Sequence, residues 1–75
     1  MKELNYYGMR ILVRNWAKYV AMDKDRHVYG YDTEPHINEA TECWLPPYKG
    51  KHYFIYEPAL LSVLGISWKL SLVEV

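Results

Sequence analysis

The sequence predicts a small, mainly β (α+β) fold: an antiparallel sheet or open barrel of four to five strands with one short helix. Three observations lead to this fold class. Apolar and aromatic residues that suit a pleated surface recur in short runs, four polar residues separate two of these runs, and one Pro-to-Gly segment is typical of a short helix. Because the chain has only 75 residues, we expect a single domain that spans residues 1–75.

The clearest local prediction is a hairpin formed by residues 17–22 and 27–31. Both runs are rich in residues that fit a pleated surface, and a shorter apolar run at residues 11–13 predicts another strand before them. Residues 23–26, with the sequence Asp-Lys-Asp-Arg, interrupt the apolar pattern. This polar break favours a type I turn between the two strands.

The register expected for this hairpin places Met22 opposite His27, which puts Tyr19 opposite Gly30. A glycine opposite a tyrosine leaves space for the ring to lie across the neighbouring backbone. We therefore expect a tyrosine ring to cover Gly30.

Residues 33–50 are predicted to form a long connection. They carry three of the four prolines and no sustained alternation, and we expect one helical turn near residues 37–41. Pro46 and Pro47 favour an extended piece, because proline cannot donate a ladder hydrogen bond. After this connection, residues 53–56 predict the third main strand.

Two more elements are expected towards the end of the chain. Pro58 precedes an apolar stretch at residues 59–64, and Gly65 follows it, which is typical of a short helix that neighbouring segments must cover. Residues 67–75 place apolar residues at alternate positions and therefore predict a strand.

Composition limits the classes of function. Nine basic residues balance nine acidic ones, and this formal net charge of zero argues against general nucleic-acid binding. No apolar stretch resembles a signal peptide or reaches the length of a membrane span, so we expect a cytoplasmic protein with no membrane partner. The single cysteine, Cys43, excludes an internal disulfide. Because so short a chain has a marginal core, we expect a homo-oligomer.

Side chains that support catalysis or metal binding are present, but their spacing is unfavourable. Asp23 and Asp25 resemble the start of a calcium loop, yet strand-like residues follow where that loop must curl, so a plain hairpin turn fits better. No glycine-rich phosphate loop, nucleophile elbow or paired-carboxylate motif occurs. We expect no enzyme, no catalytic residue, no metal and no cofactor. The possible zinc ligands lie too far apart in sequence to form close pairs; they are His27, His36, Cys43 and His52.

Aromatic residues are more informative. The chain has eight Tyr, three Trp and one Phe, more rings than so small a core can enclose. Most of them would form the core, and the others could form a subunit interface, a protein-binding patch or a stacking surface for a nucleotide ring. Nearby basic side chains could contact phosphate. The candidate ligand-binding residues are Trp16, Tyr29, Tyr31, Trp44, Tyr48, Arg10, Arg14 and Lys51.

Part of the chain resembles a pattern in small uncharacterised bacteriophage proteins. The pattern is W-x-x-[aromatic]-[apolar]-A-x-D-x-[D/N]-G, then V-[aromatic]-x-[aromatic], then a proline and a later tryptophan. The chain departs from it at Arg26, where these proteins usually have glycine, which leaves the turn type open. The matching residues, which span less than half of the chain, are Trp16, Tyr19, Val20, Ala21, Asp23, Asp25, Val28, Tyr29, Tyr31, Pro35 and Trp44.

The resemblance implies a phage accessory protein that acts by binding in the cytoplasm of the host cell. Such proteins either block a host defence protein or sequester a nucleotide signal of host immunity. The first hypothesis is therefore a non-enzymatic protein that counteracts host antiviral defence, with a nucleotide held at an oligomer interface. Two alternatives stay open: a protein-interaction module that inhibits a host enzyme, and a structural, virion-associated β protein.

Overall fold

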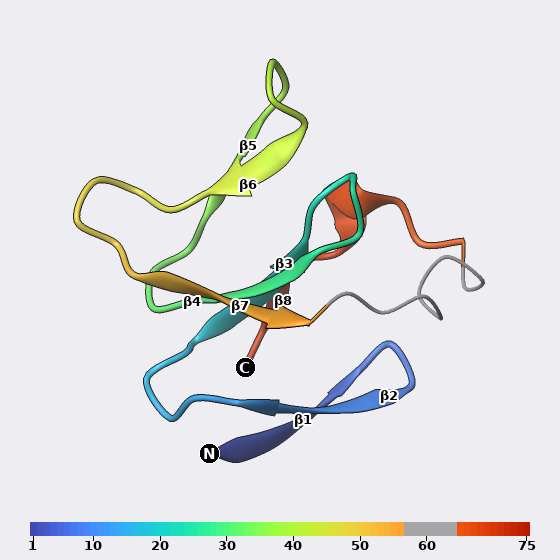
Figure 1. The fold of residues 1–75 in the computed structure, drawn as a ribbon, viewed down its shortest axis with the longest axis vertical. Coiled ribbons are helices and arrows are strands. Elements are labelled where there is room, and N and C mark those ends of the chain that lie inside the picture. Colours follow the sequence, from blue (N-terminus) through green and yellow to red (C-terminus); the bar gives the residue numbers. More distant parts are fainter. Residues whose placement is uncertain (57–64) are drawn as a thin grey trace.

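The computed structural model describes residues 1–56 and 65–75 and consists of small antiparallel sheets, which confirms the predicted β-rich class (Figure 1). The strands are β1 (Lys2–Tyr6), β2 (Met9–Val13), β3 (Tyr19–Met22), β4 (Val28–Tyr31), β5 (His36–Asn38), β6 (Cys43–Leu45), β7 (His52–Tyr56) and β8 (Val73–Glu74). A four-stranded sheet in the order β7-β4-β3-β8 lies between the β1–β2 hairpin and the β5–β6 hairpin. Among the described residues, the helical structure is one 3₁₀ turn, η2 (Trp68–Leu70).

The β1–β2 hairpin has a tight connection formed by Tyr7 and Gly8. Their φ values of 50° and 87° are both positive, as a type I′ turn requires. The Asn5 side chain supports this turn because its Oδ1 accepts a hydrogen bond from the Gly8 amide at 2.9 Å. The sequence pattern predicts only residues 11–13 of this hairpin, and the structure adds the whole of β1 and the start of β2.

The predicted central hairpin is present as β3–β4, but the predicted register is wrong by one residue. Met22 pairs with Val28 and not with His27. The Arg26 amide donates to the Asp23 carbonyl at 2.8 Å, and the Asp23 amide donates to the His27 carbonyl at 3.0 Å. Arg26 completes the turn with a left-handed φ of 75°. The Asp23–His27 bond therefore closes a shorter loop than the predicted register needs.

The shifted register changes which ring covers Gly30. Gly30 lies opposite Val20 on one side and Tyr53 on the other, and a Cβ at Gly30 would stand 2.5 Å from Cε1 of Tyr53. The expected packing of a tyrosine ring on Gly30 is thus present. The ring belongs to Tyr53 of β7, however, and the expectation of Tyr19 was wrong.

The central sheet buries different side chains on its two faces, because successive residues of a strand point to opposite sides. The face towards β1–β2 is mostly aliphatic, and the buried cluster on that side consists of Tyr6, Ile11, Val13, Ala17, Val20, Met22 and Val28. The other face carries Tyr19, Tyr29 and Tyr31, and the buried cluster towards β5–β6 consists of Ala21, Tyr31 and Trp44. Aromatic side chains therefore gather beneath the β5–β6 hairpin.

The helical turn expected near residues 37–41 is absent, because this part of the chain belongs to the β5–β6 hairpin. Oδ1 of Asn38 accepts a hydrogen bond from the Thr41 amide at 3.1 Å. Glu42 then adopts a left-handed φ of 57° before β6 begins. This side-chain bond and the left-handed residue reverse the chain direction, which a helical turn would not do.

The tail of the chain is not the continuous strand that its alternation predicts. It forms the 3₁₀ turn η2 first, and only β8 pairs with β3. Ser71, which is fully buried between these elements, accepts a hydrogen bond from the Met22 amide at 2.9 Å through its hydroxyl. That hydroxyl lies 2.7 Å from the Trp68 carbonyl, to which it donates. The Ser71 side chain thus replaces a strand neighbour at the end of β3.

The strand expected at residues 53–56 is confirmed as part of β7, which pairs with β4. Asp32 and Lys51 extend this pairing by one step. The Asp32 amide donates to the Lys51 carbonyl at 3.1 Å, and the Lys51 amide donates to Oδ1 of Asp32 at 2.8 Å. The short helix expected at residues 59–64 lies outside the described residues.

Candidate functional site

The structure distributes the eight predicted ligand-binding residues over several places. The first group is Arg14, Trp16 and Lys51; the second is Tyr29, Tyr31 and Trp44; Tyr48 and Arg10 each stand apart. Of the two groups, the first combines rings with cations and the second consists of rings alone, so the two groups offer different chemistry.

The first group forms a compact surface cluster with Tyr53, which we call the basic aromatic cluster (Arg14, Trp16, Lys51 and Tyr53). The Lys51 ammonium lies 4.6 Å from the centre of the Trp16 ring, and the Arg14 guanidinium lies 4.9 Å from the centre of the Tyr53 ring. The two rings meet edge to face, with their centres 5.2 Å apart. Each cation therefore faces the electron-rich π system of one ring of an adjoining pair.

Three separate segments place these side chains. Arg14 follows β2 directly, and its carbonyl accepts the Ala17 amide at 3.0 Å in the turn that carries Trp16. The Arg14 amide also donates to the Tyr53 hydroxyl at 2.8 Å. Lys51 precedes β7, on which Tyr53 lies above Gly30. The basic aromatic cluster thus depends on the pairing of β4 with β7.

The charges of the basic aromatic cluster remain available to an anion. Arg14 and Lys51 are exposed, and no carboxylate of the described residues forms an ion pair with either side chain. The acidic side chain that interacts with Lys51 is that of Asp32. The hydrogen bond from the Lys51 amide, then the one from the Thr33 hydroxyl, and after these the Lys51 charge, hold the pKa of the Asp32 carboxyl below its ordinary value. The Lys51 ammonium is therefore partly balanced, whereas no carboxylate in the described part of the chain pairs with Arg14.

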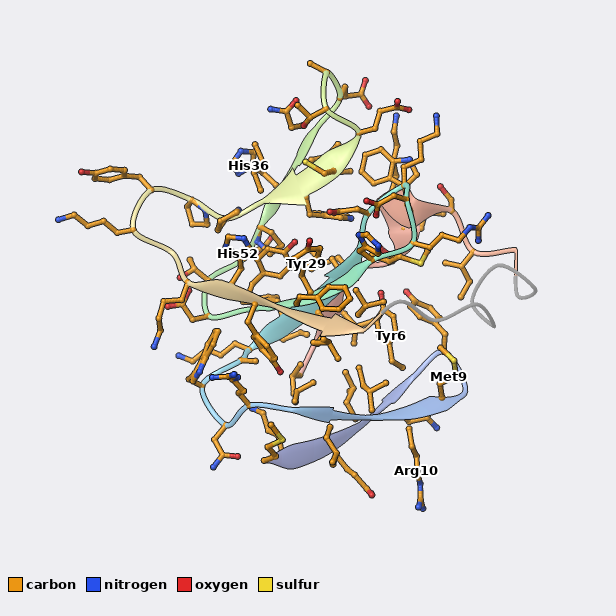
Figure 2. All side chains as sticks on the ribbon, viewed as in Figure 1. Tyr6, Met9, Arg10, Tyr29, His36 and His52 are labelled. Carbon is orange, nitrogen blue, oxygen red and sulfur yellow. The ribbon has the colours of Figure 1, made fainter. Side chains whose placement is uncertain are left out.

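The second group lines a cleft between the central sheet and the β5–β6 hairpin. One space of about 200 Å³ is bounded by the three predicted rings together with Asp23, Cys43 and His52. A second space of about 280 Å³ lies beside it, and it shares Asp23 and Cys43 with the first. We call these two adjoining spaces the acidic aromatic cleft. Both Tyr29 and His52 line the smaller space, and Figure 2 shows them close together; their ring centres are 5.8 Å apart.

Two of the predicted rings in this cleft are largely buried. Tyr31 is 1% exposed and Trp44 is 7% exposed. The Trp44 indole Nε1 donates to the Trp68 carbonyl at 3.1 Å, which joins β6 to η2. Tyr31 and Trp44 therefore belong to the core, and Tyr29, which is half-buried, presents more of its ring to the cleft.

Asp23 is the central acidic group of the acidic aromatic cleft. Its Oδ1 accepts a hydrogen bond from the Trp44 amide at 2.8 Å. Burial raises the pKa of the Asp23 carboxyl, and the Asp25 carboxylate adds to this effect, while the Trp44 hydrogen bond opposes it. Burial, followed by the charge of Asp23, also raises the pKa of the Tyr29 and Tyr31 hydroxyls. Asp23, Asp25 and Glu42 line the cleft against the single ammonium of Lys24, so its described lining carries more acidic side chains than lysines or arginines.

Tyr48 and Arg10 lie apart from both groups. Tyr48 is 93% exposed, and its ring contacts the Lys49 ammonium at 5.7 Å. Arg10 stands 4.0 Å from the Glu3 carboxylate, and in Figure 2 its side chain points away from the central sheet. Neither residue shares a ring contact with the other candidates in the described part of the chain.

Tyr53 and Asp23, which organise the basic aromatic cluster and the acidic aromatic cleft, were not predicted as site residues. Tyr53 connects Arg14 to Trp16, and the signal that could have identified it is the glycine at position 30, which needed a ring from some neighbouring strand. Asp23 was interpreted only as a turn residue. Its second role needs the β6 backbone beside it, which comes from a residue 21 positions later in the chain.

Comparison with known proteins adds no relative: no family model matches the chain, and neither the curated proteins nor the solved structures contain a significant match. The resemblance to phage proteins therefore rests on the sequence pattern of residues 16–44. No helix in the described ranges is long and apolar enough to cross a membrane.

Proposed function

We propose that this chain is a non-enzymatic, phage-type accessory protein that counteracts a host antiviral defence by binding a nucleotide signal in the host cytoplasm. The observation that supports the nucleotide is the basic aromatic cluster, in which two exposed cations lie on two adjoining rings. The phage context comes from the sequence pattern that includes Trp16.

The cluster suits the two parts of a nucleotide. A base can stack on the Trp16 indole, a contact worth about 1–3 kcal/mol per base in single-strand binding proteins. Phosphate oxygens can accept charge-assisted hydrogen bonds from Arg14 and Lys51, which are worth about 1.5–3 kcal/mol each. Stacking requires the Lys51 side chain to move from the Trp16 ring towards the phosphate.

A second copy of the chain would complete such a site. The two cations of the cluster are exposed and its two rings are half-buried on one subunit, so a base stacked on Trp16 would have its other face in water. A homo-oligomer that brings two of these surfaces together would enclose the base from both sides and would also extend the small core. We therefore place the nucleotide at a subunit interface.

Isothermal titration calorimetry with a cyclic mononucleotide, a cyclic dinucleotide and a linear oligonucleotide tests the proposal. We expect at least one of them to bind, and Arg14→Gln or Lys51→Gln to weaken that binding about tenfold. Lys49→Gln is the matched control, since Lys49 also lies on an exposed ring but outside the cluster. Absence of heat with every nucleotide would overturn the proposal, as would equal effects of the Lys49 and Lys51 variants.

Sedimentation velocity with and without the bound nucleotide tests the interface. We expect a dimer or larger assembly that the nucleotide stabilises, because a ligand that binds only the assembled form shifts the equilibrium towards it. A monomer that binds the nucleotide with unchanged sedimentation would exclude the interface but not the binding.

A further inference from the structure

The acidic aromatic cleft has a size and shape that neither the core nor the basic aromatic cluster explains. Its two spaces, of about 280 and 200 Å³, adjoin at Asp23 and Cys43. Each exceeds the share of one water molecule, about 30 Å³, by several times. The cleft can therefore hold a polyatomic group and not only a single water or ion.

The walls of the inner space favour a positive charge. Tyr29, Tyr31 and Trp44 line it, and of these the half-buried Tyr29 leaves part of its ring accessible, where the π system can attract a cation. Tyr29 is held in place by neighbouring rings, with His52 at 5.8 Å and Phe54 at 5.7 Å between ring centres. This wall is therefore largely preformed.

The charged side chains around the cleft also favour a cationic ligand. Oδ1 of Asp23 accepts the Trp44 amide, and Oδ2 accepts no hydrogen bond from any side chain or amide of the described residues. Asp25 and Glu42 also line the outer space, against one ammonium, that of Lys24. The Lys24 ammonium already pairs with Glu42, and Asp25 pairs with His27 at 3.1 Å. No lysine or arginine of the described residues pairs with Asp23, and the neighbouring groups that can carry positive charge are His27 and His52.

These side chains do not suit a metal ion. Within residues 1–56 and 65–75, no group of three or more His, Cys, Asp or Glu side chains is arranged to hold one. A single available carboxylate next to aromatic rings is instead the arrangement that recognises organic cations, because the ring faces supply attraction without needing ligand oxygens.

We propose that the acidic aromatic cleft binds an organic cation of the alkylguanidinium or alkylammonium class, with Asp23 as its charge partner and the Tyr29 ring as its wall. The cationic head lies in the inner space near Oδ2 of Asp23, and the alkyl part extends into the outer space. This site is separate from the basic aromatic cluster, whose ligand is an anion, so either proposal can fail without the other.

Nuclear magnetic resonance titration tests the proposal, with the Trp44 backbone amide as the reporter because it donates to Asp23 at the cleft. The probes are n-butylguanidinium and n-butylammonium, and N-butylurea is the neutral analogue of the same shape. We expect at least one cation to give saturable shifts and the urea to give none. A peptide that carries one arginine and one lysine forms a further arm: tighter binding than the free cations identifies a protein side chain as the ligand, and weaker binding identifies a free small molecule.

Variants test whether the Asp23 carboxylate binds the cation. Asp23→Asn keeps an oxygen that accepts the Trp44 amide but removes the charge, and we expect cation affinity to fall about tenfold. Asp32→Asn is the matched control, since Asp32 also accepts a hydrogen bond from a backbone amide but lies outside the cleft. The affinity of the Asp32→Asn variant for the cation should equal that of the wild type. Tyr29→Leu should weaken binding about threefold or more even if Asp23→Asn does not fold. Saturation by the urea, absence of saturation with both cations, or unchanged affinity in both cleft variants would overturn the proposal.

Discussion

The ring of Tyr53 packs on the backbone of Gly30 in the adjacent strand, so closely that a Cβ at Gly30 would stand 2.5 Å from Cε1 of the ring. The two residues are direct partners in the β4–β7 pairing. The same ring carries the Arg14 guanidinium and meets the edge of Trp16. Because Gly30 has no side chain, the Tyr53 ring can lie against the central sheet. This placement of the ring positions the basic aromatic cluster, which we propose to bind a nucleotide.

Gly30→Ala should lower the free energy of unfolding by about 1–3 kcal/mol, because the Tyr53 ring cannot move without losing its contacts with Arg14 and Trp16. Urea denaturation measures this loss. In a Tyr53→Ala background the same change should have almost no further effect, since the clash is gone. Equal losses in both backgrounds would show that the ring is not the reason for the glycine.

Ser71→Ala should lower the free energy of unfolding by about 1–3 kcal/mol. The change leaves the buried Met22 amide without its hydrogen-bond acceptor, which the Ser71 hydroxyl supplies at 2.9 Å. Ser67→Ala is the matched control, because Ser67 is exposed and makes no side-chain capping bond to η2. Thermal and urea unfolding of both variants check the difference, and similar stabilities would contradict the role of Ser71.

Arg26→Gly should raise the stability by up to about 1 kcal/mol. Arg26 has a left-handed φ of 75° in the central hairpin, a conformation that glycine adopts without the steric penalty of a Cβ. Asn15→Gly, in another exposed turn but with no positive φ, should not stabilise the protein. An unfolding midpoint of Arg26→Gly at or below that of the wild type would argue against strain at this position.

The contribution of Asp32 should depend on pH in a defined direction. The Lys51 amide holds the pKa of Asp32 below its ordinary value of 3.8. Its stabilising contribution is therefore present above that ordinary value and is lost as the pH falls through the lowered pKa of the folded protein. Denaturation of wild type and Asp32→Asn from about pH 6 to about pH 2 should show their difference in stability narrowing in acid. A difference that does not change with pH would contradict the prediction.

Local patterns predicted the parts of the fold that depend on neighbours in sequence. The β3–β4 hairpin and β7 follow from short runs of strand-forming residues, and the polar break at residues 23–26 correctly marks the turn. The predicted register was wrong because the actual register depends on the left-handed backbone conformation of Arg26. A residue other than glycine gives no sequence signal for that conformation.

The tail and the β5–β6 hairpin were missed for a different reason. The alternation from residue 67 onwards is real, but the buried Ser71 hydroxyl accepts the Met22 amide in place of a strand neighbour, and the strand is interrupted. In the hairpin, the Asn38 side chain bonds to the Thr41 amide and redirects the chain. Both effects come from single polar side chains, to which hydrophobic periodicity is insensitive.

The sequence by itself determined the β-rich class, the central hairpin and an excess of rings, because these follow from composition and short-range alternation. Only the tertiary structure determined which of those rings lie beside cations and which lie beside a carboxylate. The pairing of β7 with β4 gathers Trp16 and Tyr53 with two cations, whereas the docking of β6 places Trp44 against Asp23. Contacts between strands far apart in sequence thus divided one set of aromatic residues into a basic surface and an acidic cleft.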